Sequence, residues 1–319
     1  MKNWKEAKKT FTPSAFFQNR RAELSTQQIV LMIILITSFA VILFFLFRLG
    51  IGEKSEEQLC HNSVLQKASV FSDAPLQCYR NYVCITKDGS CEKLIKPEKI
   101  KVKTLDEVYV ALANEMADCW WMFGEGKVEY VGKDLTKNNY CSICSQIYFD
   151  DSLENLEGIE NKKISKDELY DYLTKNEYSK DKTYSQYLLG TNDLSIFKEQ
   201  GSFGNIEIGK QYFNVMGITS EVKNVWTSSF VAGSVGYTSV GLIGTFFGPP
   251  GWIVSAIIIG GSVATTAATL TISDLIEPEI GAIIVQGKGI DNQFMIPTLQ
   301  EANSDKFKAL NCEEILSYS

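Results

Sequence analysis

The chain has very little histidine: its 319 residues include one, His61. Ser-His-acid and Cys-His catalysis both use a histidine as the general base, so His61 would have to serve alone. The sequence also lacks a Gly-Lys-Ser/Thr phosphate-binding loop, a nucleophile elbow and the Asp-x-Asp-x-Asp-Gly spacing of a calcium loop. These absences give no support to the common hydrolase and nucleotide-binding classes. We expect no catalytic residue, metal or cofactor.

Charge is absent from a run of twenty residues, 28–47. A helix of this length rises about 30 Å, which is the thickness of a bilayer hydrocarbon core. Residues 1–22 before it carry six basic side chains and one acid, a balance of +5 that favours the cytoplasmic side. A cleavable secretory signal has a shorter apolar region of about 7 to 15 residues, so we interpret the run as an anchor in the cell membrane.

The cysteines all follow this run, on the side that would be outside the cytoplasm. Their number is even and the environment there is oxidising, so we expect disulfides. The net charge of the chain is −7, so residues 23–319 carry −12. An acidic exterior argues against a nucleic-acid partner. The disulfide candidates are Cys60, Cys78, Cys84, Cys91, Cys119, Cys141, Cys144 and Cys312.

The residues Arg20-Arg21-Ala22, followed by Glu-Leu-Ser-Thr-Gln, resemble the class III signal of archaeal type IV pilin-like proteins. In that family a membrane peptidase cuts after a small residue that basic residues precede. The resemblance implies a cut after Ala22, which would release the helix for lateral assembly; the alternative is an uncut signal anchor. Segments 111–126 and 139–147 resemble uncharacterised membrane-anchored archaeal proteins, which implies class and location but no activity.

The part after the anchor is typical of an α+β fold. Thr104 and Glu107 form a capping-box pattern, and apolar residues then recur at spacings of three and four as far as Gly124, which predicts a helix. Ser165 and Glu168 predict a second helix. Strands are expected at 81–87, 91–95, 129–131 and 211–218. Asp88-Gly89 predicts a two-residue hairpin, which would leave Cys84 and Cys91 diagonal and bonded elsewhere.

A second charge-free run covers residues 224–273. Its length fits two membrane helices joined by Gly-Pro-Pro-Gly, and small residues let such helices pack closely. The alternatives are a re-entrant or inserting hairpin and a buried element of the outer domain. The helix-packing candidates are Gly233, Gly236, Gly241 and Gly244. The expected organisation is a cytoplasmic leader (1–22), a transmembrane anchor (23–48), a linker (49–57), an extracytoplasmic α+β domain (58–223), a Gly-rich helical hairpin (224–273) and a C-terminal extracytoplasmic segment (274–319).

Three further patterns have more than one interpretation. Cys141-x-x-Cys144 fits a structural disulfide, a redox pair, or a metal site completed by Cys60 and His61 or by Cys119. Trp120 and Trp121 fit a ligand pocket, or one core ring beside one ring at an interface. The acids between 150 and 160 form a loose calcium-like cluster or, more simply, a solvated segment.

These patterns together predict a membrane-anchored protein of the cell envelope with a structural or interaction role. Its expected partners are the lipid bilayer, other envelope proteins and further copies of itself through the membrane helices. A membrane-inserting or pore-forming oligomer built on residues 228–272 is the alternative function. A thiol-disulfide oxidoreductase using Cys141 and Cys144 is the third.

Overall fold

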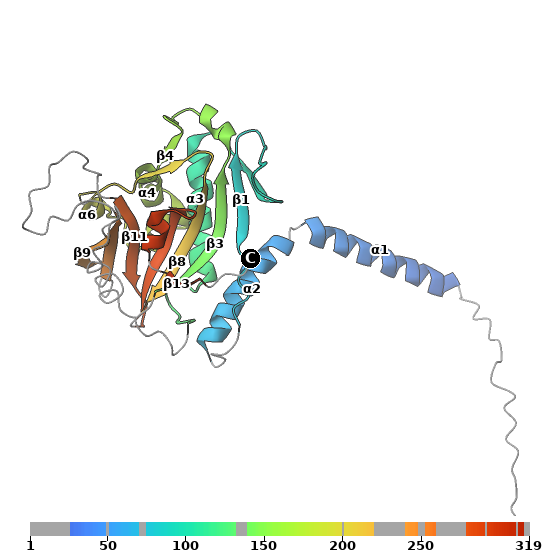
Figure 1. Cartoon of the computed structure of the whole chain (residues 1–319). Coiled ribbons are helices and arrows are strands. Elements are labelled where there is room, and N and C mark those ends of the chain that lie inside the picture. Colours follow the sequence, from blue (N-terminus) through green and yellow to red (C-terminus); the bar gives the residue numbers. More distant parts are fainter. Residues whose placement is uncertain are drawn as a thin grey trace, which may run out of the picture. The chain divides into compact units, whose positions relative to one another are not determined.

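The structure is a computed structural model that describes residues 26–48, 51–69, 75–131, 139–199, 201–219, 240–247, 253–259, 279–290, 292–310 and 312–315 (Figure 1). The chain divides into two compact units, Met1–Gly52 and Glu53–Ser319. The proposed cleavage position and Gly233 and Gly236 lie outside the described residues.

The first unit contains helix α1 (Thr26–Arg48). Its side chains from Gln27 to Phe45 are all exposed. Among the described residues it is the one helix that is long and apolar enough to cross a membrane.

The second unit combines helices and strands, as the sequence predicts. Its helices are α2 (Ile51–Ala68), whose first two residues belong to the first unit, α3 (Leu105–Met122), η1 (Asp151–Asn155), α4 (Lys166–Lys175), α5 (Tyr184–Leu188), α6 (Ser195–Lys198) and α8 (Asp305–Ala309). Its strands are β1 (Asn81–Thr86), β2 (Glu98–Lys101), β3 (Asn139–Phe149), β4 (Lys163–Ser165), β5 (Glu177–Ser179), β6 (Lys182–Thr183), β7 (Asn205–Glu207), β8 (Gln211–Thr219), β9 (Val240–Phe247), β10 (Ile253–Ile259), β11 (Glu279–Gln286), β12 (Gln293–Glu301) and β13 (Cys312–Ile315).

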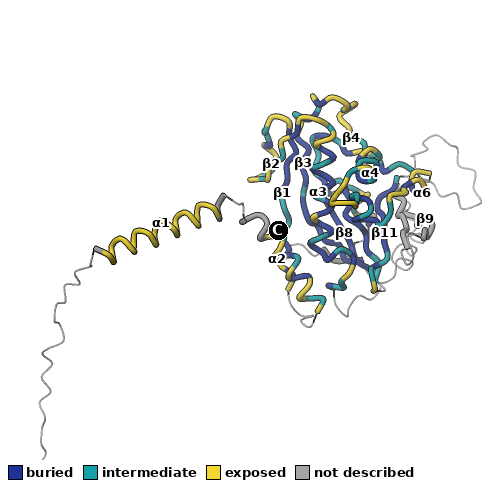
Figure 2. The backbone as a smooth tube through the Cα atoms, turned by 180° about the vertical axis from the view of Figure 1, so that it is seen from behind, coloured by how far each residue is buried: buried dark blue, intermediate teal, exposed yellow. Residues whose placement is uncertain are grey.

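A nine-stranded mixed sheet organises the unit. Its strands follow the order β2-β1-β3-β8-β12-β11-β10-β9, and β13 pairs with β3. The pairs β1/β2, β1/β3 and β3/β13 are parallel, and the pairs from β3 to β9 are antiparallel. Figures 1 and 2, which view the unit from opposite sides, show α3 and α4 on one face of the sheet.

The main core lies between this face and the helices, and Figure 2 shows it as a buried interior. It includes Trp120 of α3, Phe149 of β3 and Phe294 of β12. A smaller core lies on the opposite face, where the rings of Phe213 and Phe307 are 5.2 Å apart. The long apolar strands are buried on both faces because helices cover one and α8 packs on the other.

Helix α3 forms where its sequence pattern predicts it. The side chain of Thr104 accepts a hydrogen bond from the Glu107 backbone, and the Glu107 carboxylate accepts one from the Lys103 backbone at 2.6 Å. The first-turn amide groups of a helix have no partner inside the helix, so these contacts stabilise its start. The helix ends before Gly124, whose φ of +81° suits glycine. At the start of helix α4, the Ser165 side chain accepts a hydrogen bond from the Glu168 backbone.

The predicted hairpin at Asp88-Gly89 is wrong. The chain makes a longer loop after β1, and β2 then runs parallel to β1 with Val83 opposite Glu98. A two-residue turn joins antiparallel strands only, so a parallel partner needs a longer connection. The loop brings Cys84 and Cys91 together as a disulfide, which corrects the expectation that each bonds elsewhere.

The helical hairpin expected over 224–273 is also wrong where the structure describes it. Residues 240–247 and 253–259 are the antiparallel strands β9 and β10. Gly241 pairs with Ile258, and Gly244 lies at a shift of the register, where an extra residue in one strand forms a bulge. A continuous apolar run fits a buried strand as well as a membrane helix, so apolarity alone did not distinguish them. The rest of 224–273 lies outside the described residues.

Two smaller differences concern local structure. The linker expected at 49–57 is helical from Ile51 onward, as the start of α2. The short strand expected at 129–131 is irregular chain. The strands expected at 81–87 and 211–218 are confirmed as β1 and β8.

Candidate functional site

The two cysteines of the Cys-x-x-Cys motif lie on opposite faces of β3. Cys141 bonds to Cys312 of β13, and Cys144 bonds to Cys119 of α3. Successive side chains of a strand alternate between its faces, so positions i and i+3 point apart. A register shift between Ile143 and Ser145 leaves Cys144 without an opposite residue on β8, and both Cys144 and Ser145 then face α3. The two cysteines therefore form structural disulfides on the two faces of β3, and they are not available as a redox pair or as metal ligands.

The remaining cysteines are also paired. Cys60 bonds to Cys78 and Cys84 bonds to Cys91, so none of the eight is free. In the described part of the chain, the one group of three metal-ligand types with adjacent atoms is Cys84, Cys91 and Asp150. Its two sulfur atoms are bonded to each other, so the group offers a single carboxylate. A metal site using Cys60 is excluded in the same way by its disulfide.

The two tryptophans of α3 have different environments. Trp120 is 0% exposed and packs edge-on against Phe294, with ring centroids 6.1 Å apart, which confirms the core interpretation. Trp121 is partly exposed and stacks on His61 of α2 at 4.1 Å. The Nδ1 atom of His61 lies 2.7 Å from the Trp121 carbonyl oxygen. His61 thus joins α2 to α3, and it faces no nucleophile in the described contacts.

The acids between 150 and 160 do not assemble a calcium site in the described structure. Asp150 caps η1 by accepting from the Ser152 backbone at 3.0 Å. Asp151 pairs with Lys93 at 3.4 Å, and Glu154 pairs with Lys162 at 2.7 Å. Asp150 is buried, whereas the two ion pairs lie at the surface, so the acids make separate contacts and share no site.

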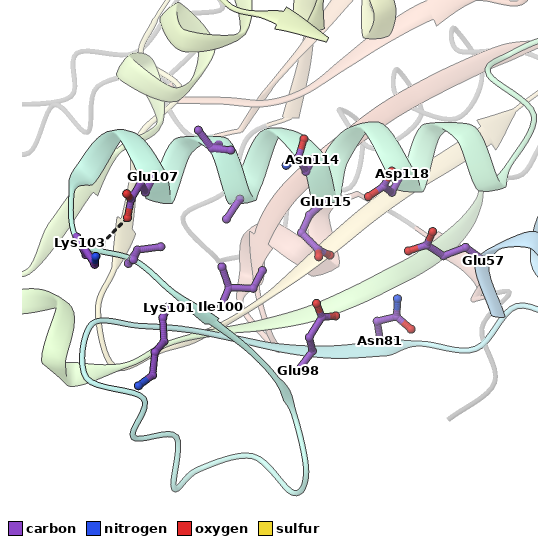
Figure 3. A pocket seen from close by; sticks show the side chains of 13 residues that line it. Glu57, Asn81, Glu98, Ile100, Lys101, Lys103, Glu107, Asn114, Glu115 and Asp118 are labelled. Carbon is purple, nitrogen blue, oxygen red and sulfur yellow. Dashed lines mark hydrogen bonds between the residues drawn. The ribbon is translucent and has the colours of Figure 1, made fainter. Parts of the chain in front are cut away.

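A groove of about 470 Å³ lies between α3 and the outer strand β2 (Figure 3). Asn81 at the start of β1 and Glu57 of α2 close one end of it. Its volume is in the range of ligand-binding clefts. The charged residues that line the groove are Glu57, Glu98, Lys101, Lys103, Glu107, Glu115 and Asp118.

Acidic side chains gather at one end of this groove. Figure 3 shows Glu115 and Asp118 descending from α3, Glu98 rising from β2 toward them, and Glu57 approaching from α2. In the same view, Lys101 points away from this cluster and Lys103 lies at the other end. We call the four acids Glu57, Glu98, Glu115 and Asp118 the acidic end of the groove.

Glu115 has a strongly perturbed environment. Burial, together with the negative charges of Glu98, Asp118 and Glu57, raises the pKa of its carboxyl from the usual 4.5 to about 7. The nearby Ser145 hydroxyl opposes the shift, although no hydrogen bond of regular geometry joins the two groups. Carboxyl groups with strongly perturbed pKa values in a cleft are candidates for a functional site.

Two buried polar atoms near Glu115 have no hydrogen-bond partners, and their residues do not line the groove. They are the hydroxyl oxygen of Ser145 on β3 and the side-chain oxygen of Asn214 on β8. These residues are 1% and 0% exposed and lie opposite each other in the sheet. The Asn214 amide donates to the Glu115 backbone carbonyl at 2.8 Å. Buried polar groups are normally paired, so these two atoms have unused hydrogen-bonding capacity.

The spacing of the acids does not fit one small metal ion. In the described structure, no three of them bring their oxygen atoms within 4.8 Å of one another. Calcium holds its oxygen ligands at about 2.3 to 2.6 Å, so its ligands lie within about 5 Å of each other. The arrangement fits a larger cation with several N–H donors.

The sequence analysis did not find this groove. Its acids come from three different elements: β2 and α3 follow each other directly in the chain, and α2 lies well before them. Glu115 and Asp118 are three residues apart, which places them on one side of α3. That spacing is equally typical of a solvated helix face. Comparisons with models of protein families, with curated proteins and with solved structures found no match for this chain.

Proposed function

We propose that this protein is anchored in a membrane by α1 and has a structural or interaction role outside the cytoplasm. The observation that carries the proposal is the pairing of all eight cysteines in four disulfides. Disulfides persist in oxidising compartments and are rare in the cytosol. The exposed apolar surface of α1 supports the anchor, because such a surface is stable in lipid and unfavourable in water.

The two other candidate functions have less support. An oxidoreductase needs a pair of reactive thiols, and Cys141 and Cys144 bond to separate partners on opposite faces of the sheet. The pore-forming alternative depends on paired membrane helices, and the described parts of that segment are strands β9 and β10.

Thiol counting tests the oxidising location. We expect mass-shift alkylation of the denatured protein to find no free cysteine before reduction and eight after it. Cells grown with and without a membrane-permeant reductant provide the control for alkylation itself. Six or more free thiols in the untreated protein would contradict the proposed location.

An epitope tag at the end of the chain tests the orientation. Protease added to intact cells should remove a tag placed after Ser319 and spare a cytoplasmic marker protein. Alkaline washing should leave the protein in the membrane fraction. Protection of the C-terminal tag, or release of the protein by the wash, would contradict the proposal.

We also propose, on the resemblance of residues 20–31 to a pilin-like signal, that a peptidase removes residues 1–22. The intact mass of the purified protein should then correspond to a chain that starts at Glu23. The variant Arg20→Gln/Arg21→Gln is the control, since it removes the basic residues before the cut and should retain the leader. A full-length mass for the unaltered protein would leave α1 as an uncut anchor.

A further inference from the structure

The groove between α3 and β2 has a feature that its acids alone do not explain. Near Glu115, the buried oxygen atoms of Ser145 and Asn214 have no hydrogen-bond partners. Both atoms can accept hydrogen bonds, and they neighbour Glu115, which lines the groove. A ligand that brings several N–H donors to this end of the groove would pair with the Glu115 carboxyl group.

The charge at this end of the groove selects a cation. Glu98, Asp118 and Glu57 each act on Glu115 as negative charges, so the local potential is negative. The acids are too widely spaced for three of them to share one small ion. A guanidinium group presents five donors in a planar fork, and an ammonium group presents three, so either can contact more than one carboxylate.

The neighbouring strand favours an extended polypeptide as the source of that cation. Strand β2 is the outermost strand on this side of the sheet, and within the described residues it pairs with β1 alone. Its residues Glu98 and Ile100 line the groove, and three of its four residues are exposed. A peptide in extended conformation can hydrogen-bond to such an edge and place alternate side chains in the adjacent groove.

We propose that this groove binds a basic, extended segment of a partner protein, with an arginine or lysine side chain seated on Glu115. The proposal rests on the interaction role proposed above and names the class of partner. The acidic end of the groove attracts the basic side chains of the segment. The segment runs along the outer edge of β2.

Binding to the full-length protein in nonionic detergent tests the proposal. The probe is a fluorescent peptide of about eight alternating Arg and Thr residues, which spans roughly 26 Å when extended. A peptide with Glu in place of Arg is the charge control, and spermidine is the control for a cation without a peptide backbone. We expect saturable binding of the basic peptide, weakened by added salt, and no binding of the acidic one.

Two variants locate the binding. Glu98→Gln/Asp118→Asn should weaken the basic peptide by about tenfold, because it removes two charges from the acidic end. Glu157→Gln/Glu177→Gln is the matched control, since both residues are exposed and lie outside the groove, and it should bind as the unaltered protein does. Circular dichroism confirms that each variant is folded. Equal affinity in the two double variants would overturn the assignment.

Two further results separate the alternatives. If spermidine competes as strongly as the peptide at equal charge, the site is a simple cation site and the extended-segment proposal is wrong. Failure of the peptide to bind, while the tag and alkylation experiments place the domain outside the cytoplasm, would overturn this inference and leave the proposed location standing.

Discussion

Replacing Glu115 by Gln should stabilise the protein at alkaline pH. Burial, together with the charges of Glu98, Asp118 and Glu57, raises the pKa of Glu115 from 4.5 to about 7. In the folded protein this carboxyl group therefore holds its proton at pH values where the unfolded chain has released it. Glutamine has nearly the same shape and is neutral at every pH, so Glu115→Gln removes the cost of ionisation and leaves the packing of α3 in place.

The sign and size follow from the linkage between protonation and folding. The folded-state pKa is the higher one, so stability is largest below about pH 4.5 and falls as the pH rises to about 7. The difference of 2.5 pKa units, 7 minus 4.5, corresponds to about 3 kcal/mol at most, at 1.36 kcal/mol per unit. Glu115 keeps partial contact with solvent, which reduces the expected gain to about 1 to 2 kcal/mol.

Thermal unfolding of the full-length protein in nonionic detergent measures this effect. A gain of 1 to 2 kcal/mol should raise the midpoint by roughly 3 to 6 °C at about pH 8 and by less than about 1 °C at about pH 5. The exposed residue Glu157 supplies the control, since Glu157→Gln should shift neither midpoint. An equal shift at both pH values would refute the reasoning, because the gain would then come from packing and not from ionisation.

The other expectations concern the core and its disulfides. Trp120→Ala should lower the free energy of unfolding by about 3 to 5 kcal/mol, because it removes a fully buried ring from between α3 and β12. Trp121→Ala should lower the free energy of unfolding much less, because this ring is partly exposed and contacts mainly His61 of α2. Equal losses in chemical denaturation would contradict this packing. Replacing both Cys141 and Cys312 with serine opens a loop of 171 residues and should lower the free energy of unfolding by up to about 5 kcal/mol. The same replacement of Cys84 and Cys91, which are 7 residues apart, should lower it by about 2 kcal/mol. Denaturation midpoints of the two double variants compare the losses directly, and a larger loss from the short loop would contradict the loop-entropy argument.

The Glu115→Gln variant also connects stability with the proposed binding. A purely structural role for this carboxyl group predicts that the more stable variant binds the basic peptide unchanged. A binding role predicts weaker peptide binding in the same variant at about pH 8, where the unaltered carboxyl is charged. Measuring both quantities on one preparation therefore distinguishes the two roles.

Local patterns in the sequence were sufficient for several elements. Helix α3 follows from its cap at Thr104, its apolar spacing and its stop at Gly124, all of which lie within about twenty residues. The core position of Trp120 follows from the same spacing. The apolar helix α1 follows from composition alone. In each case neighbouring residues supply the energy that decides the structure, so a short window contains the information.

Contacts between distant segments decided the rest. Cys141 and Cys144 are near neighbours in sequence, yet the alternation of β3 and its bulge send them to partners 171 and 25 residues away. The charge-free segment contains strands β9 and β10 because β11 offers them a sheet edge, which composition does not reveal. The acidic end of the groove exists only where α2, β2 and α3 meet. The sequence by itself determined the helices with strong local signals, the paired state of the cysteines and the apolar N-terminal segment. Tertiary structure alone decided the disulfide partners, the strands of the apolar run and the groove, because each depends on which distant surfaces are buried together.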